Sequence, residues 1–262
     1  IFFSILFFTC FSNNSNVCFA NICRLVVTCN IHTKIEIDKG RDALMAPLLI
    51  FDALARGRAD LAGSDQLAAV ALRSLDQRGL ERATSQQLAN LCRSCGTLQP
   101  GSSVVSEIFA KAVEMHADMP SRRLAMVLQG LCMQDEPLTN ESALIQTLRG
   151  TVAERLDNED DLHPQTVLTF ASSLAIKGEV DDVLHCFNWF MVDTSSLLQI
   201  SARGLVELAH AAAHQVQDRT KMADFLRALD RSIHMKQFDL SEEERSKARD
   251  CFRKLLVKTS GW

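Results

Sequence analysis

The feature that most constrains the fold of this chain is an apolar stripe that recurs about every forty residues. In the segment 84–98, apolar side chains fall at positions i, i+3, i+4 and i+7, which places them on one face of an α-helix. The spacing recurs three more times, and the first positions of successive stripes are 36, 43 and 38 residues apart. The four stripes are Leu88, Leu91, Cys92 and Cys95; Leu124, Val127, Leu128 and Leu131; Val167, Phe170, Ala171 and Leu174; and Leu205, Leu208, Ala209 and Ala212.

Between the stripes lies a second helical pattern, so that each period holds two helices. The second helices are led by Ile108, Ile145, Val183 and Phe225. A lone helical hairpin cannot cover its own apolar face, so neighbouring repeats must stack on it. We therefore predict an all-α fold, an α-solenoid of stacked antiparallel helix pairs with a period of about 36–43 residues. A non-repetitive helical bundle is the alternative.

The helical patterns divide the chain at about residue 40. Residues 41–262 form the predicted helical-repeat domain, in which 44–79 resembles an earlier, degenerate repeat and 241–256 a closing helix. Residues 1–40, rich in Phe, Cys and Asn at their start, form a separate segment that is extended or anchoring. Its first apolar run, residues 1–8, is too short to cross a bilayer, so no transmembrane span is predicted. A trimmed leader, a hydrophobic anchor onto a partner and an error in gene prediction all remain open for this segment.

Local signals predict where several helices begin and end. Thr84 with Gln87 three residues later resembles a capping box, and Ser121 is expected to cap the next stripe helix. Pro164 suits the first turn of the third stripe helix. Gly96 and the Pro-Gly pair that follows it are expected to stop the first stripe helix.

The stripe helices resemble those of the octotricopeptide and heptatricopeptide repeat families and of the related FAS-activated-kinase-like organellar proteins. In these families the first helix carries a Leu-x-x-Leu pattern and then a small residue, similar to Leu88, Leu91 and Cys92 here. The resemblance covers about residues 82–235. It implies RNA binding in mitochondria or chloroplasts and, for some members, a place in an organellar ribosome. The RAP-type domain usual in these families is not visible in this sequence, which argues against a free-standing RNA-processing factor.

If the array reads RNA bases, the polar positions opposite each stripe are the contacts. Amide and guanidinium groups there could hydrogen-bond exposed base edges, one set per repeat. The candidate RNA-binding residues in the repeats are Gln86, Asn90, Arg93, Arg122, Gln129 and Arg203. The same positions also fit the solvated side of an amphipathic helix. Met126 and Glu207, which occupy equivalent positions, suit RNA badly and favour this second interpretation.

Charge is distributed unevenly along the chain. The net charge of the 262 residues is −4, yet residues 215–262 carry +3, which leaves −7 for residues 1–214. An anionic partner is therefore expected at the C-terminal end. The predicted closing helix adds Arg249, Arg253 and Lys254 as candidate RNA contacts. A terminal repeat needs a polar outer face in any case, so a solvated cap is the alternative.

No motif in the sequence predicts catalysis. It contains no nucleophile elbow, P-loop or dinucleotide-binding glycine motif, so we expect neither enzyme activity nor a cofactor. Cys92 and Cys95 form a Cys-x-x-Cys pair, but both belong to the apolar stripe, so we expect core packing. His210 and His214 lie one helical turn apart without the glutamate of a zinc-protease motif, and no metal site is expected.

Two functions remain. The first is an RNA-contacting protein of the mitochondrial matrix, in its most specific form a structural component of a mitochondrial ribosome, with ribosomal RNA and neighbouring proteins as partners. The second is a scaffolding accessory subunit of a mitochondrial membrane complex, such as a respiratory complex or ATP synthase, without RNA contact. The mitochondrial location follows from the family resemblance alone. Basic residues clustered on one face would favour RNA, whereas even dispersal would favour scaffolding.

Overall fold

The computed structural model describes residues 80–98, 103–158, 162–215 and 222–259, and every regular element in these ranges is a helix. The predicted all-α class is therefore confirmed for this part of the chain, whereas the segment 1–40 and the degenerate early repeat lie outside it. The four stripe helices are α6 (Ser85–Leu98), α8 (Ser121–Cys132), α10 (Pro164–Lys177) and α12 (Ala202–Gln215); together with the predicted closing helix, α14 (Glu242–Thr259), they are here called first helices. The second helices are α7 (Ser103–Glu114), α9 (Glu141–Asn158), α11 (Val180–Val192) and α13 (Ala223–Met235).

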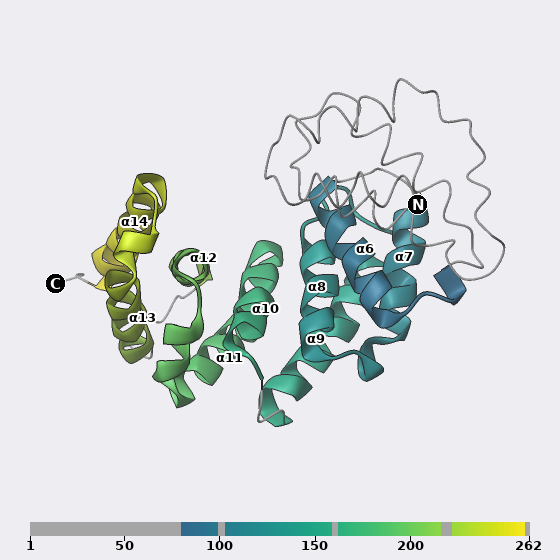
Figure 1. The fold of residues 1–262 in the computed structure, drawn as a ribbon, viewed down its shortest axis with the longest axis horizontal. Helices are drawn as coiled ribbons and strands as arrows, with labels where there is room; N and C mark the ends of the chain where they lie inside the picture. Colours follow the sequence, from purple (N-terminus) through teal and green to yellow (C-terminus); the bar gives the residue numbers. More distant parts are fainter. Residues whose placement is uncertain (1–79, 99–102, 159–161, 216–221, 260–262) are drawn as a thin grey trace, which may run out of the picture.

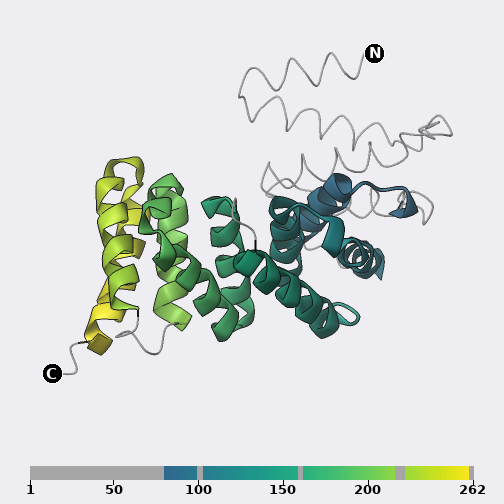
Figure 2. The ribbon, with the colours of Figure 1, turned by 90° about the horizontal axis from the view of Figure 1, so that it is seen from below.

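The helices follow one another in two rows. Each first helix contacts the next, from α6 through α8, α10 and α12 to α14, and the second helices α7, α9, α11 and α13 contact one another in the same order. Each second helix also packs on the first helix that precedes it. Both ribbon views show this progression from α6 and α7 at one end to α13 and α14 at the other (Figure 1, Figure 2).

The core lies between the rows and is made by the predicted stripes. All sixteen side chains of the four stripes are fully buried. The residues that lead the second helices are buried as well, and they meet the first helices from the other side. Between α11 and α13 the contact is aromatic, because Phe187 and Phe225 stack with ring centroids 4.9 Å apart and Phe190 lies beside them. The side chains on the predicted apolar faces are therefore the ones that are buried in the structure.

A buried corner residue precedes each first helix by two positions. Three short 3₁₀-helices, η1 (His116–Asp118), η2 (Thr194–Gln199) and η3 (Gln237–Asp239), follow α7, α11 and α13, and each leads into such a corner. The corner after each 3₁₀-helix has an extended backbone and donates its N–H back to a 3₁₀ carbonyl. The five corner residues are Ala83, Met119, Leu162, Ile200 and Leu240.

Side chains at the ends of two second helices bind the corner that precedes the first helix of the same pair. The contacts run from Arg155 Nη2 to the carbonyl oxygens of Ala117 (2.8 Å) and Met119 (3.5 Å), and from Lys236 Nζ to those of Leu198 (2.7 Å) and Ile200 (2.6 Å). In both cases the acceptors precede the donor by 38 and 36 residues. A cation at the end of a helix pair thus satisfies carbonyl groups in the corner that leads into that pair.

The sequence predicts that Gly96 helps to end the first stripe helix, but in the structure the helix continues past it. The helix α6 continues to Leu98, and Gly96 lies inside it against Gly130 of α8. A Cβ atom on Gly96 would lie 2.6 Å from the Gly130 carbonyl oxygen, so the two backbones touch directly. The glycine serves close helix packing rather than termination.

The helix starts agree with the predicted caps in two cases and differ in one. At α6, Thr84 and Gln87 form the expected capping box, in which the Thr84 N–H donates to Gln87 Oε1 at 2.8 Å. Pro164 occupies the first turn of α10. Ser121 is not a cap: it is the first residue of α8, and the N-cap position is held by Pro120 without a side-chain hydrogen bond.

Candidate functional site

The polar residues predicted to read RNA from the first helices are partly engaged with one another. Gln86 donates from Nε2 to Asn90 Oδ1 (3.1 Å) and accepts from Arg123 Nε (2.9 Å). Arg123 also donates to Ser85 Oγ at 2.7 Å, so it links α8 to the start of α6. Of the remaining candidates, Arg122 and Arg203 are exposed and Arg93 and Gln129 are half-buried. Arg203 lies 3.5 Å from Glu207 on its own helix.

Several cations that the sequence did not single out join neighbouring helices. Arg149 of α9 pairs with Glu179 (2.6 Å) and Asp182 (2.5 Å) at the start of α11. Lys177 at the end of α10 pairs with Glu141 at 2.7 Å, and Arg155 and Lys236 hold the corner carbonyls. The one available sequence signal is that Lys177, Arg155 and Lys236 sit at helix C-termini, where cations meet unsatisfied carbonyls. These cations are structural parts of the repeat junctions.

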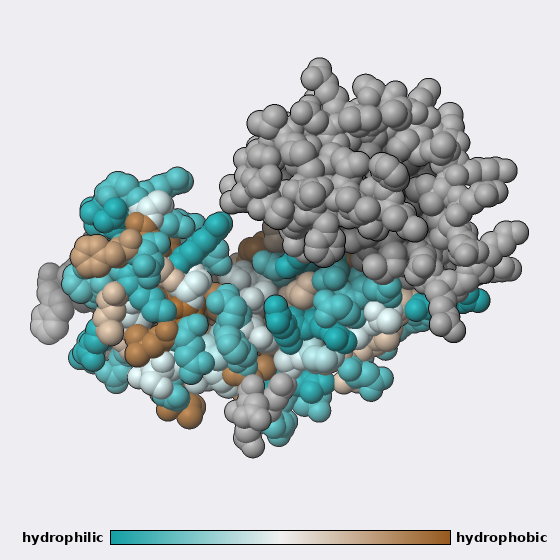
Figure 3. Space-filling view, viewed as in Figure 1, coloured by the Kyte–Doolittle hydropathy of each residue, from teal (hydrophilic) through white to brown (hydrophobic). Residues whose placement is uncertain are grey.

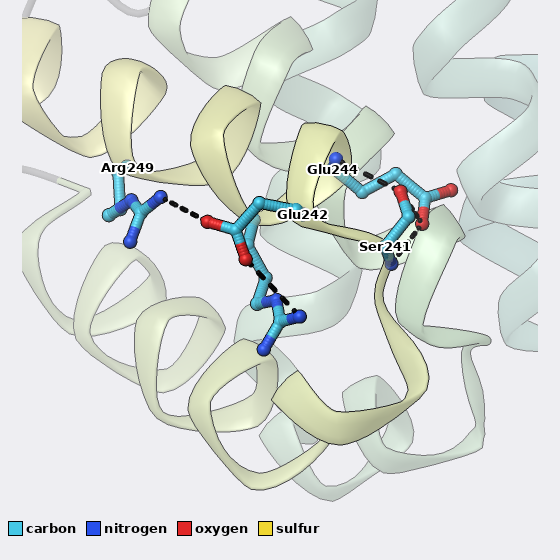
Figure 4. A network of polar contacts seen from close by, with 5 residues as sticks. Ser241, Glu242, Glu244 and Arg249 are labelled. Atoms are coloured by element: carbon cyan, nitrogen blue, oxygen red, sulfur yellow. Dashed lines mark hydrogen bonds and ion pairs between the residues drawn. The ribbon is translucent and has the colours of Figure 1, made fainter.

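The arginines of α14 pair with acids of the same helix. Glu242 accepts from both Arg245 (3.3 Å) and Arg249 (3.1 Å), as Figure 4 shows for Arg249, and Arg253 pairs with Asp250 at 3.1 Å. Glu244 forms a capping box with Ser241 at the start of α14. The N–H and the hydroxyl of Ser241 donate to the Glu244 carboxylate and hold its pKa below the usual value. Residues 242–249 hold three acids and three cations, so the excess of positive charge of α14 comes from Arg253, Lys254 and Lys258 in its second half.

A groove of about 530 Å³ separates α13 from α14. Its apolar lining is Ile233, Leu240, Ala248 and Phe252, and its polar lining is Asp230, His234, Gln237, Arg245, Arg249 and Arg253. The three arginines follow one another at four-residue intervals and so form one wall of the groove. Figure 3 shows hydrophobic residues among hydrophilic ones over this end of the molecule. Ile233, Leu240 and Ala248 are themselves buried, so Phe252 is the one apolar side chain of the lining that stays partly exposed.

The opposite flank of α14 faces α12 and is also basic. His210 and His214 of α12 lie with ring centroids 4.5 Å apart. Partial burial lowers the pKa of His210 below its usual value, and Lys247, His214 and Lys254 lower it further. The charges of Lys247 and Lys254 beside these rings disfavour a bound cation. Within the described residues, no group of three or more His, Cys, Asp or Glu side chains is arranged to hold a metal ion.

The cysteines of the described helices are buried thiols. Burial raises the pKa of Cys95 and of Cys132 to about 12. For Cys92, burial and the neighbouring Cys95 raise the pKa well above the usual value. The Cys-x-x-Cys pair therefore has the packing role expected from the stripe and lacks the low pKa of a redox thiol.

We expect Cys92, Cys95 and Cys132 of the native protein to resist alkylation by iodoacetamide at pH 8. Because the nucleophile is the thiolate, a pKa of about 12 leaves on the order of one thiol in ten thousand reactive at that pH, and burial blocks access as well. Peptide mass spectrometry before and after unfolding in urea would measure the modification of each site. Rapid labelling of Cys92 or Cys95 in the folded protein would show that α6 does not pack as described.

In the described part of the chain, no helix is both long and apolar enough to cross a membrane. No family model, curated protein or solved structure matches the chain.

Proposed function

We propose that the chain is an α-solenoid that serves as a protein scaffold, an accessory subunit that holds other chains in a larger assembly. Support for the solenoid comes from the two rows of helices and from the corner residue that recurs before each first helix. Arg155 and Lys236 also bind the corner of their own helix pair at the same sequence offsets. Stacked repeats of this kind present long surfaces and no enclosed site, which suits a protein that binds other proteins.

The observation that carries the scaffold proposal is the use of cations inside the array. A base-reading array needs a set of available cations in each repeat, because phosphate contacts supply most of the affinity for RNA. Here Arg123, Arg149 and Lys177 are engaged with neighbouring helices, and Arg203 pairs with Glu207. A phosphate would have to displace these contacts, and those between helices stabilise the repeat junctions.

RNA contact is the second candidate, and the observation that favours it is confined to α14. His210, His214, Lys247 and Lys254 gather on one flank of this helix, and Arg249 and Arg253 lie on the other. In this proposal, the protein is a component of a mitochondrial ribosome that meets ribosomal RNA with its C-terminal end. The remaining candidates, Gln86, Asn90, Arg93, Arg122, Gln129 and Arg203, would then be solvated surface rather than base contacts.

Ribonuclease treatment of the native assembly separates the two proposals. Mitochondria from the organism that makes the protein would be lysed gently. One half of the lysate would be treated with ribonuclease, and both halves would be run on a density gradient. We expect the protein to migrate as part of a large assembly whose position ribonuclease leaves unchanged. A known mitochondrial ribosomal protein in the same gradient is the control and must shift. If the protein shifts together with this control, RNA contact replaces scaffolding, and absence from the mitochondrial fraction would contradict the proposed location.

A further inference from the structure

Four basic side chains gather where α14 packs on α12, the first helix before it in the row (Figure 1). His210 and His214 lie one turn apart on α12, with ring centroids 4.5 Å apart, and both side chains are exposed. Lys247 and Lys254 are exposed on α14. These four residues are here termed the basic cluster. Since α12 and α14 are packed together, the array itself holds the two halves of the cluster in place.

The buried face of α14 fixes the side on which its two lysines lie. Lys247, Cys251 and Lys254 follow one another at i, i+4 and i+7, so they share one side of the helix. Cys251 is buried, and α14 packs chiefly on α12. The two lysines therefore border the contact between the helices, and their charges lower the pKa of His210 across it.

The acids nearest to the basic cluster along the two helices have partners of their own. Glu207 of α12 lies 3.5 Å from Arg203, and Asp250 of α14 lies 3.1 Å from Arg253. Within the described residues, neither histidine of the cluster nor Lys247 forms an ion pair with an acid. The cluster therefore keeps its positive charge for an anion from outside the chain.

The charged groups with the largest effect on His210 are all basic. After burial, they are His214 and the two lysines of the cluster, and each lowers its pKa. On the other side of α12, α10 has Lys177 as its one charged residue, and this lysine pairs with Glu141 at 2.7 Å. The helices α11 and α13 pack on the buried side of α12, away from the exposed His210. The potential at His210 is therefore positive, and a bound anion would relieve the repulsion.

We propose that the basic cluster binds a phosphate group that carries two negative charges, such as a phosphate monoester. A monoester has three free oxygens, so it can accept hydrogen bonds from both helices at once. A lysine ammonium donates up to three hydrogen bonds and a protonated imidazole two, and bonds between charged partners are the strong ones. A phosphodiester of RNA carries one charge and fewer free oxygens, so it offsets less of the charge of the cluster. The site does not depend on the proposed scaffold function.

The affinity for such an anion should rise as the pH falls, because a bound anion favours the protonated imidazole. The gain appears as the pH passes through the pKa of His210, which lies below the usual value of about 6.5. A phosphate monoester has a second pKa of about 6 and loses one charge in the same range, so its affinity should be greatest near pH 6. Sulfate keeps both charges, so its affinity should still be rising at about pH 5.

Proton NMR of the histidine rings in the full chain tests the site. Inorganic phosphate and sulfate are titrated from about pH 5 to about pH 8 at constant ionic strength, and the variants His210→Gln and His214→Gln assign the two ring signals. We expect a dissociation constant on the order of 1 mM for phosphate near pH 6, and a higher pKa of His210 in saturating sulfate than without it. His185, which pairs with Asp157 at 2.8 Å, is an internal control and should respond much less.

Two double variants of α14 separate the basic cluster from the general charge of the helix. Lys247→Gln/Lys254→Gln should weaken sulfate binding at least about tenfold. The matched control Arg249→Gln/Arg253→Gln removes two charges from the other flank of α14 and should change the affinity less than about twofold. Because all four positions are exposed, thermal unfolding of both variants should match that of the parent protein, which checks their fold.

The histidines are tested by the pH dependence itself. His210→Gln/His214→Gln should bind sulfate with an affinity that no longer changes with pH, while the lysines keep part of that affinity. Sulfate binding by the parent protein that does not change with pH would contradict the proposal. Equal affinities of the lysine and arginine double variants would contradict it as well.

A small phosphorylated molecule and a phosphorylated side chain of a partner protein present the same chemistry. Adenosine monophosphate and a peptide with one phosphoserine serve as probes for the two sources, and the tighter binder identifies the source. The same peptide without phosphate should not bind. If a single-stranded RNA without terminal phosphates binds more tightly than both probes, the cluster is a site for the RNA backbone and the monoester assignment is wrong. The ribonuclease gradient judges the scaffold function without this cluster, so the two proposals can fail separately.

Discussion

Replacing Gly130 by alanine should destabilise the protein by about 3 kcal/mol, although alanine is the better helix former by about 1 kcal/mol. The cause is the direct contact between α6 and α8. A Cβ atom on Gly130 would lie 2.1 Å from the Cys92 carbonyl oxygen and 2.9 Å from the Arg93 nitrogen. These are backbone atoms inside a helix, so they cannot move aside as a flexible side chain would. The two helices would have to separate, and the buried stripes that they share would lose packing.

Gly150→Ala is the matched control for this prediction. Gly150 also lies inside a helix, α9, but a Cβ atom there would have nothing within 4 Å. This change should stabilise the protein by about 0.5–1 kcal/mol through helix propensity and a less flexible unfolded chain. Urea titrations followed by circular dichroism would give both free energies of unfolding. Equal effects of the two changes would show that α6 and α8 are not in backbone contact.

Truncation of Phe170 to alanine should cost about 3–5 kcal/mol, and truncation of Leu128 about 2–5 kcal/mol. Both side chains are fully buried, on α10 and α8, where successive first helices meet. Each truncation removes apolar contacts and leaves a cavity that the stacked helices close only in part. Thermal and urea unfolding would measure the losses.

The control for the core truncations is Ile176→Ala, in the same helix as Phe170. Ile176 is 60% exposed, so this change should alter the free energy of unfolding by no more than about 0.5 kcal/mol. A loss of less than about 1 kcal/mol for both Phe170→Ala and Leu128→Ala would mean that the stripes are not the core.

The helices and their buried faces could be predicted from the sequence because both depend on local periodicity. An α-helix brings residues at i, i+3, i+4 and i+7 to one face, so an apolar stripe such as 88–95 predicts which side of the helix is buried. The capping box of Thr84 and Gln87 could also be predicted, because its two residues lie only three positions apart. Residues 1–79, with the predicted division at residue 40, lie outside the described structure.

The repeat junctions could not be predicted, because they join residues that lie more than thirty positions apart. Gly96 is a plausible helix stop until its contact with Gly130 is known. Arg155 and Lys236 look like ordinary cations at helix ends, and only the folded array brings the corner carbonyls to them. The corner leucine Leu240 falls outside the stripe spacing and was therefore missed.

The exposure of the C-terminal arginines could be predicted from the sequence, but their contacts could not. The uneven charge along the chain pointed to the C-terminal helix, and Arg249 and Arg253 do lie on a surface there. Their contacts with Glu242 and Asp250, and the groove beside them, depend on which way each side of α14 faces. Helical periodicity alone does not give that direction for a helix at the end of a row.

The direct contact between Gly96 and Gly130 has a consequence for the shape of the whole array. Where two rows of helices run side by side, the row with the closer spacing lies on the inside of a bend. With no side chain between them, the α6 and α8 backbones touch, whereas a Leu or Phe would hold two helices apart, and a closer approach in one row would bend the rows toward it. Larger residues at both positions would straighten the array there. Every surface beyond that point, including the distant C-terminal end, would then swing through space with its own structure unchanged.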